Sequence, residues 1–174
     1  MELSIISKIS MFFSSYTLLF IALAVKNYQN KALWLLLSIS ILGLVATFFI
    51  LHTRINPDEA SIVQIKTKNE LVTGYLVTYI LPFLSFNLNS LTELLSLLII
   101  LITICVLYIK ADLIYINPTL MLMGYNIYDI EMDNGRKRTL LSKKKIQDLK
   151  LLSEITFYEL HDRMIIIERV VNDE

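Results

Sequence analysis

Side chains able to do chemistry are few in this chain of 174 residues. Its two histidines, His52 and His161, lie far apart, and neither has a partner at metal-ligand spacing. The single cysteine, Cys105, excludes an internal disulfide and a cysteine-built metal site. Only four glycines are present, and no phosphate-binding loop, nucleophile elbow or pair of catalytic carboxylates can be found. We therefore expect a protein that is not an enzyme and that uses neither a cofactor nor a metal.

One dense group of charged side chains stands out near the C-terminal end. It places six cations within ten residues: Arg136, Lys137, Arg138, Lys143, Lys144 and Lys145. Beside a membrane, each such cation attracts anionic lipid by about 1 kcal/mol. The same cations would suit a protein partner or pair with acids of the chain. We do not expect direct nucleic-acid binding, because no aromatic residues are interleaved and the net charge of the chain is zero.

The composition shows what kind of scaffold must position these groups. The chain is 55% hydrophobic and 18% charged, with a mean hydropathy of +0.60. Charged residues are nearly absent from four blocks, at about 9–25, 32–51, 71–86 and 91–109. Each block is long enough, or nearly so, to cross a bilayer as a helix. We therefore predict a transmembrane domain over 1–112 and a soluble tail over 113–174.

The connections between the blocks predict their arrangement and orientation. Two connections are too short to join anything except antiparallel neighbours, so we expect an all-α four-helix bundle made of two hairpins. Four spans place both termini and the loop at 52–70 on one side. Of the sixteen Lys and Arg residues, only Lys26 and Lys31 fall on the other side, so both termini are predicted to be cytoplasmic. Cleavage after the signal-like triplet at 22–24 stays an alternative that would remove the first span.

Polar groups inside the predicted spans are hydroxyls rather than ionisable side chains. Transporters and pumps keep ionisable groups in the bilayer, and this chain has none between its span ends. We expect the hydroxyls to bond to their own helix backbone or to a neighbouring helix. Tyr75, Tyr79 and Phe83 recur at helical spacing around a kink at Pro82, which favours a packing face within the bundle or between subunits.

The tail has the alternating pattern of strands. From Tyr128 apolar and acidic residues alternate up to Asn134–Gly135, which predicts a two-residue hairpin turn and a returning strand over 136–142. That turn places Glu131 opposite Arg138 and Ile130 opposite Thr139. It also sets Asp133 opposite Arg136 and Tyr128 opposite Leu141.

Further elements complete a small β-rich domain. A short helix over 143–153 and strands over 155–160 and 164–170 are expected, in a small sheet or an SH3-like, partly closed barrel. Residues 62–67, in the loop before the third span, also alternate. We predict that they pair with the tail.

Two segments carry a resemblance to a known family. The run NPTLMLMGYNIY from Asn117 to Tyr128 and the run YLVTYILPF from Tyr75 to Phe83 resemble the membrane subunit of the Kiwa anti-phage defence system. The resemblance implies a multi-pass protein of the bacterial inner membrane that forms homo-oligomers and senses envelope disturbance. It further implies a soluble cytoplasmic effector as partner (KwaB-like) that acts against phage DNA, and it carries over no catalytic residue.

The residues alone leave two other functions open. A small oligomeric channel would line its pore with the hydroxyl residues, and single-channel conductance would reveal it. A structural accessory subunit of a membrane complex would copurify with a membrane enzyme.

Overall fold

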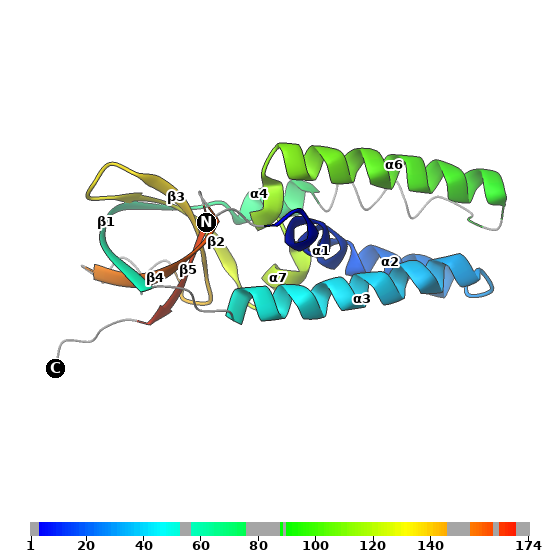
Figure 1. Ribbon diagram of the computed structural model, residues 1–174, viewed down its shortest axis with the longest axis horizontal. Helices are drawn as coiled ribbons and strands as arrows, with labels where there is room; N and C mark the ends of the chain where they lie inside the picture. Colours follow the sequence, from blue (N-terminus) through cyan, green and yellow to red (C-terminus); the bar gives the residue numbers. More distant parts are fainter. Residues whose placement is uncertain are drawn as a thin grey trace. The chain divides into compact units, whose positions relative to one another are not determined.

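The computed structural model of the chain describes residues 4–52, 57–75, 88, 90–145, 154–161 and 164–169. It divides into a helical unit, Ser4–Ile50 with Val72–Thr119, and a barrel unit, Leu51–Leu71 with Leu120–Glu174 and Met1–Leu3. The helices are α1 (Ile5–Ser15), α2 (Thr17–Lys26), α3 (Lys31–His52), α4 (Asn69–Tyr75), α6 (Leu91–Lys110) and α7 (Pro118–Leu122), with a 3-10 turn η2 (Leu113–Tyr115) (Figure 1). The strands are β1 (Pro57–Thr67), β2 (Asn126–Met132), β3 (Lys137–Ser142), β4 (Glu154–His161) and β5 (Met164–Arg169).

Two helices of the described segments, α3 and α6, are long and apolar enough to cross a membrane. They match the spans predicted at 32–51 and 91–109, which are confirmed as single helices. The start of α6 is set by Ser90, whose hydroxyl accepts a hydrogen bond from the backbone N–H of Glu93 at 3.2 Å. This is the N-cap that a Ser followed three residues later by Glu predicts.

The first predicted span, 9–25, is wrong as a single straight helix. It is divided into α1 and α2, which meet at Tyr16 with a bend of 50°. Hydroxyl groups beside the bend donate to backbone carbonyls, as Ser15 does to Phe12 at 2.7 Å and Thr17 does to Ser14 at 2.9 Å. Such bonds compete with the helix ladder and favour a break. The bent pair would add a third membrane-length element if it forms one span.

The third predicted span, 71–86, lies mostly outside the described residues. Only its start is seen, as part of α4. The four-helix bundle therefore stays a prediction.

Aromatic side chains of the bent pair form the centre of the helical unit. Phe12, Tyr16 and Phe20 are buried, and the rings of Phe12 and Tyr16 lie 4.7 Å apart between centroids. The Phe12 ring also meets Tyr108 of α6 edge-on at 5.4 Å. Phe12, Tyr16 and Phe20 have the same i, i+4, i+8 spacing as the aromatic residues of the third predicted span. A packing face was predicted from the sequence only in the third span, and this one was missed.

Gly43 lets α3 pass close to α1. A Cβ atom at this position would lie 2.8 Å from the Ser10 carbonyl oxygen and 3.1 Å from Phe13 Cβ. Small residues at helix crossings in membranes permit such close backbone approach.

We expect Gly43→Ala to destabilise the helical unit by about 1–3 kcal/mol, because the added methyl group overpacks against a backbone oxygen. Gly74→Ala is the matched control, since a Cβ atom there would have no neighbour within 4 Å. The measurement is the thermal unfolding midpoint of the purified full-length chain in mild detergent. Equal midpoints for the two variants would show that α1 and α3 do not cross at Gly43.

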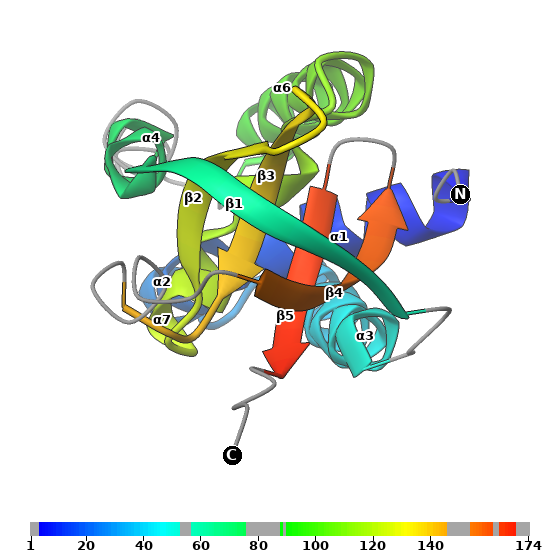
Figure 2. The ribbon, with the colours of Figure 1, turned by 90° about the vertical axis from the view of Figure 1, so that its left-hand side faces the viewer.

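The five strands close into a barrel in the order β1-β2-β3-β5-β4. Neighbours are antiparallel except β3 and β5, which are parallel. Figure 2 shows β1 lying beside both β2 and β4. The predicted pairing of 62–67 with the tail is confirmed, with Thr67 opposite Tyr128 and Ile65 opposite Ile130. The barrel is closed rather than partly open, because residues 57–61 extend β1 to meet β4.

The barrel interior is filled from alternate positions of its strands. Its apolar cluster consists of Ile65, Tyr128, Ile130, Met132, Leu140 and Phe157, with Ile62 packed against it. An irregularity in register between Ile62 and Gln64 lets Ile62 and Ile65, three residues apart, reach the same interior. The alternation of apolar and acidic residues along β2 predicts its inner face correctly, because Tyr128, Ile130 and Met132 all lie in this cluster.

The hairpin register predicted from a two-residue turn is wrong by one residue. Met132 pairs with Arg136 through an N–H···O bond of 3.0 Å, so the loop holds three residues and ends at Gly135, with φ of +73°. The N–H of Asp133 donates to the Ser61 carbonyl of β1 at 3.1 Å, which removes Asp133 from the hairpin ladder. Three-residue loops with a left-handed glycine are a common alternative.

This loop moves every predicted pair by one position on β3. Glu131 lies opposite Lys137 and not Arg138, Ile130 lies opposite Arg138 and not Thr139, and Tyr128 lies opposite Leu140 and not Leu141.

Candidate functional site

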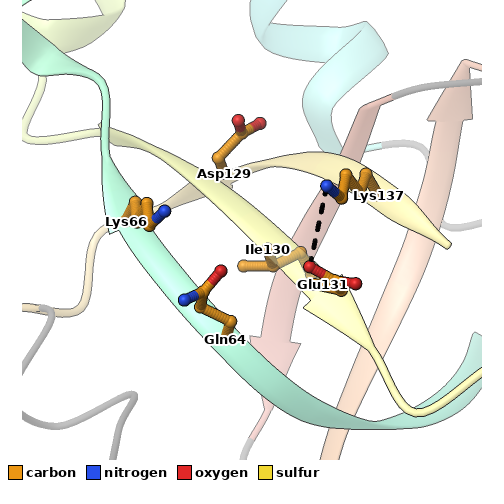
Figure 3. Close-up of a pocket in the computed structure, with 6 residues that line it drawn as sticks. All are labelled: Gln64, Lys66, Asp129, Ile130, Glu131 and Lys137. Carbon is orange, nitrogen blue, oxygen red and sulfur yellow. Dashed lines mark ion pairs between the residues drawn. The ribbon is translucent and has the colours of Figure 1, made fainter. Parts of the chain in front are cut away.

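A shallow hollow of about 80 Å³ lies on the charged outer face of the barrel. It is lined by Gln64, Lys66, Asp129, Ile130, Glu131 and Lys137, drawn as sticks in Figure 3. These residues come from β1, β2 and β3, which are consecutive neighbours in the barrel. The hollow is therefore built from a continuous piece of sheet surface.

The register places each acid of this face opposite one lysine. Asp129 of β2 lies opposite Lys66 of β1, and Glu131 lies opposite both Gln64 of β1 and Lys137 of β3. Opposite residues of neighbouring strands share a face, so these charges compensate one another across the sheet.

Two ion pairs lie on this face. Lys68 Nζ lies 2.8 Å from a carboxylate oxygen of Asp129, and Lys137 Nζ lies 3.8 Å from one of Glu131. The Lys137 side chain is 75% exposed, so its pair contributes little to stability and its charge remains open to a partner. The hollow is too small and too polar for a typical small-molecule pocket. This face is a patterned ionic surface of alternating acidic and basic side chains.

The six cations of the predicted contact run are not brought together. Arg136, Lys137 and Arg138 lie beside the hairpin loop, which we call the tip group, whereas Lys143, Lys144 and Lys145 follow the other end of β3. Four residues of β3, 139–142, separate the groups, which places Arg138 and Lys143 roughly 17 Å apart along the strand. The run therefore forms two separate groups rather than one compact patch of six charges.

The tip group is the more accessible of the two. Arg136 and Lys137 are exposed, while Arg138 is half-buried on the side of the sheet that it shares with Ile130. In the second group, the Lys143 ammonium lies 4.8 Å from the centroid of the Tyr125 ring, a cation–π contact. Burial raises the pKa of Tyr125, so the ring stays neutral at physiological pH. The carbonyl of Lys144 accepts the Tyr128 hydroxyl at 2.9 Å.

Other residues considered for chemistry are not gathered into one site among the described residues. The structure describes no group of three or more His, Cys, Asp or Glu residues that could hold a metal, within the part of the chain that it covers. His52 ends α3, and His161 ends β4. Asp112, with φ of +54°, lies 3.7 Å from Lys8 Nζ at the end of α6. The packing face of Tyr79, Pro82 and Phe83, together with the side chain of Tyr75, lies outside the described residues.

Hydroxyls of the helical unit follow the expected packing role. Ser38, Thr47, Ser96 and Thr103 each donate to the carbonyl four residues earlier in the same helix, at 2.8–2.9 Å. Their protons are thus engaged with backbone rather than directed into a pore.

One polar cluster was missed by sequence reasoning. The amide nitrogen of Asn117 donates to Ser14 Oγ at 2.7 Å, and the hydroxyl of Thr119 donates to the Ser14 carbonyl at 2.8 Å. All three residues are buried. The bond from Asn117 to Ser14 joins residues 103 apart, so no local pattern of the sequence predicts it.

Comparison with known proteins gives the family. The Kiwa protein KwaA of Escherichia coli O55:H7 (strain RM12579 / EPEC) is 25% identical over 115 residues, 64% of this chain. The match spans 58% of that relative, less than two thirds of its length. No solved structure matches the chain. The model of the family described as anti-phage protein KwaA matches residues 7–166, from α1 to β5. Since this match takes in both the helical unit and the barrel, the chain belongs to the KwaA family of anti-phage proteins.

Proposed function

We propose that the chain is a non-enzymatic component of the bacterial inner membrane that senses envelope disturbance and recruits a soluble cytoplasmic effector during phage infection. The observation that carries the proposal is that two separate parts of the chain supply the strands of one barrel. β1 follows α3, whereas β2 to β5 follow α6, and all five close one barrel. Membership of an anti-phage family supplies the setting.

The barrel constrains the membrane topology. Since β1 pairs with β2, Thr67 and Asn126 belong on the same side of the bilayer, and the chain between them crosses it an even number of times. The scarcity of Lys and Arg around the turn between α2 and α3 favours placing that turn outside the cell. The termini and the barrel then lie in the cytoplasm, where a soluble protein can bind.

The apolar side chains exposed on α3 and α6 suit lipid or further copies of the chain. Leu35, Leu42 and Phe49 on α3, and Ile99 and Ile102 on α6, are more than 60% exposed in the single chain. An assembly of several copies would bury part of this surface. We accordingly propose a homo-oligomer, with the remainder of the surface in contact with lipid.

The tip group is the docking surface that we propose for the effector. Its exposed cations, Arg136 and Lys137, lie next to the ionic face around Asp129 and Glu131. Such a pattern selects a partner with acidic side chains at matching positions, and charged contacts of this kind raise the rate of association. The second group of lysines, at 143–145, serves as the comparison, because Lys143 contacts the Tyr125 ring and the Lys144 carbonyl accepts the Tyr128 hydroxyl.

The test reverses charge at one end of β3 at a time. Arg136→Glu with Lys137→Glu alters the tip group, and Lys143→Glu with Lys145→Glu is the matched control. Each tagged full-length chain is purified from its native host in mild detergent, with and without phage, and copurifying proteins are identified by mass spectrometry. Plaque counts on the same strains measure protection.

We expect the tip variant to lose both the soluble partner and protection from phage, while the control variant keeps both. A chain that purifies alone, or a tip variant as protective as the wild type, would contradict the proposal. Thermal melting of both variants checks that the barrel is intact.

A further inference from the structure

The break between α1 and α2 leaves backbone carbonyls that need donors other than the helix ladder. The Phe12 carbonyl accepts Ser15 Oγ, and the Phe13 carbonyl accepts the N–H of Tyr16 at 3.1 Å. The Ser14 carbonyl accepts two hydroxyls, from Thr17 at 2.9 Å and from Thr119 at 2.8 Å. In an apolar environment every such group has to be satisfied, so these bonds stabilise the bend.

One of these bonds, from Thr119, comes from a segment distant in sequence. Asn117 is 1% exposed and Thr119 is 8% exposed. Asn117 bonds to Ser14 Oγ and also accepts the N–H of Thr119 at 3.0 Å, which fixes the start of α7. We call Ser14, Asn117 and Thr119 the clamp. It ties the break of the first membrane element to α7.

α7 leads directly into the barrel. It ends at Leu122, and its last turn is closed by bonds from Gly124 N–H to the Met121 carbonyl and from Tyr125 N–H to the Leu120 carbonyl. β2 begins at the next residue, Asn126. Only residues 120–125 therefore separate Thr119 from the first residue of β2.

The bonds of the clamp would change if α1 and α2 formed one straight helix. If α1 and α2 straighten into one helix, the Ser14 carbonyl accepts the N–H of Leu18 and no longer needs the Thr119 hydroxyl. One bond at the Ser14 carbonyl would thus be exchanged for another, as a two-state element requires. The bend of 50° also shortens the pair by about 3 Å relative to a straight helix. A thin bilayer therefore favours the bent state and a thick bilayer the straight one.

We propose that the clamp is a bilayer-sensitive latch. It is closed when α1 and α2 are bent, and it opens when they straighten. Opening releases α7, the helix that precedes β2 in the chain. This inference rests on the proposed function, because it supplies the route by which an envelope disturbance reaches the barrel.

The experiment measures hydrogen exchange of the full-length chain in vesicles. Short-chain (dimyristoleoyl) and long-chain (dierucoyl) phosphatidylcholine provide the thin and the thick bilayer. We expect the amides within residues 118–125, of which Pro118 carries none, to exchange about tenfold faster in the thick bilayer. Amides of β2 report in the same run that the barrel is folded.

Thr119→Val removes the donated hydroxyl and keeps the side-chain shape. It should make residues 118–125 exchange fast in both lipids. Thr103→Val is the control, because the Thr103 hydroxyl is exposed on α6 and donates only within its own helix, to Ile99. Ser14→Ala is a second clamp variant that removes only the acceptor of Asn117, and it should reduce the dependence on lipid.

Equal exchange of wild-type residues 118–125 in the two lipids would overturn the latch. So would a Thr119→Val variant that keeps the dependence on lipid. Since the vesicles contain only this chain and lipid, the outcome is independent of whether the chain recruits an effector, which the plaque and copurification assays decide.

Discussion

Replacing residues 57–67 by a Gly/Ser segment of equal length is expected to abolish the barrel while leaving the helices in place. β1 pairs with β2 over one half and with β4 over the other, so its loss opens the barrel and exposes the ladder groups of two strands at once. It also removes Ile65 from the apolar cluster. Hydrogen exchange of the full-length chain should show protection of β2 and β4 falling to the level of an unfolded segment.

A single substitution on the same strand provides the control for that replacement. Val63 is 69% exposed, and Val63→Ser should leave the protection of β2 and β4 unchanged. If the Gly/Ser replacement kept this protection, the tail would fold without the loop strand, and the argument that both segments share one side of the membrane would fail.

Leu140→Ala is expected to destabilise the barrel by about 2–5 kcal/mol. Leu140 is fully buried in the apolar cluster, opposite Tyr128, and its truncation leaves a cavity that a closed barrel cannot easily collapse. Domains of this kind have only about 5–15 kcal/mol of stability in total, so the loss is large. Denaturant unfolding followed by the hydrogen exchange of the β2 and β3 amides measures it.

Val63→Ala is the matched truncation on the barrel surface. It should change the stability by less than about 0.5 kcal/mol, since no buried contact is lost. A similar cost for both truncations would show that Leu140 does not lie in a packed interior.

The barrel strands were predictable because their periodicity is local. Alternation from Tyr128 and over residues 62–67 needs no knowledge of distant contacts, and it places Ile65 and Ile130 on inner faces. Closure could not be predicted, since it depends on β1 reaching β4 through residues that precede its alternating part.

The predicted hairpin register is wrong because a third strand, β1, affects the length of the turn. Asn134–Gly135 predicts a two-residue turn when only the hairpin is considered. The Ser61 carbonyl takes the N–H of Asp133 and lengthens the loop to three residues. A shift of one residue transfers the ion pair of Glu131 from Arg138 to Lys137, and thereby changes which cation is half-buried.

The clamp escaped prediction for a related reason. Nothing near Ser14 in the sequence indicates that Asn117 is its partner, because the bond joins residues 103 apart. The bend between α1 and α2 was not predicted either, since an apolar run that contains hydroxyl residues is equally compatible with a straight helix.

Single-cysteine labelling tests most directly the claim that the barrel meets its partner inside the cell. With the native cysteine removed by Cys105→Ser, Asn134→Cys marks the hairpin loop of the barrel and Tyr28→Cys marks the exposed turn between α2 and α3. A membrane-impermeant maleimide should label Tyr28→Cys in intact spheroplasts and Asn134→Cys only after lysis. Labelling of Asn134→Cys in intact spheroplasts would place the barrel outside and contradict recruitment of a cytoplasmic effector.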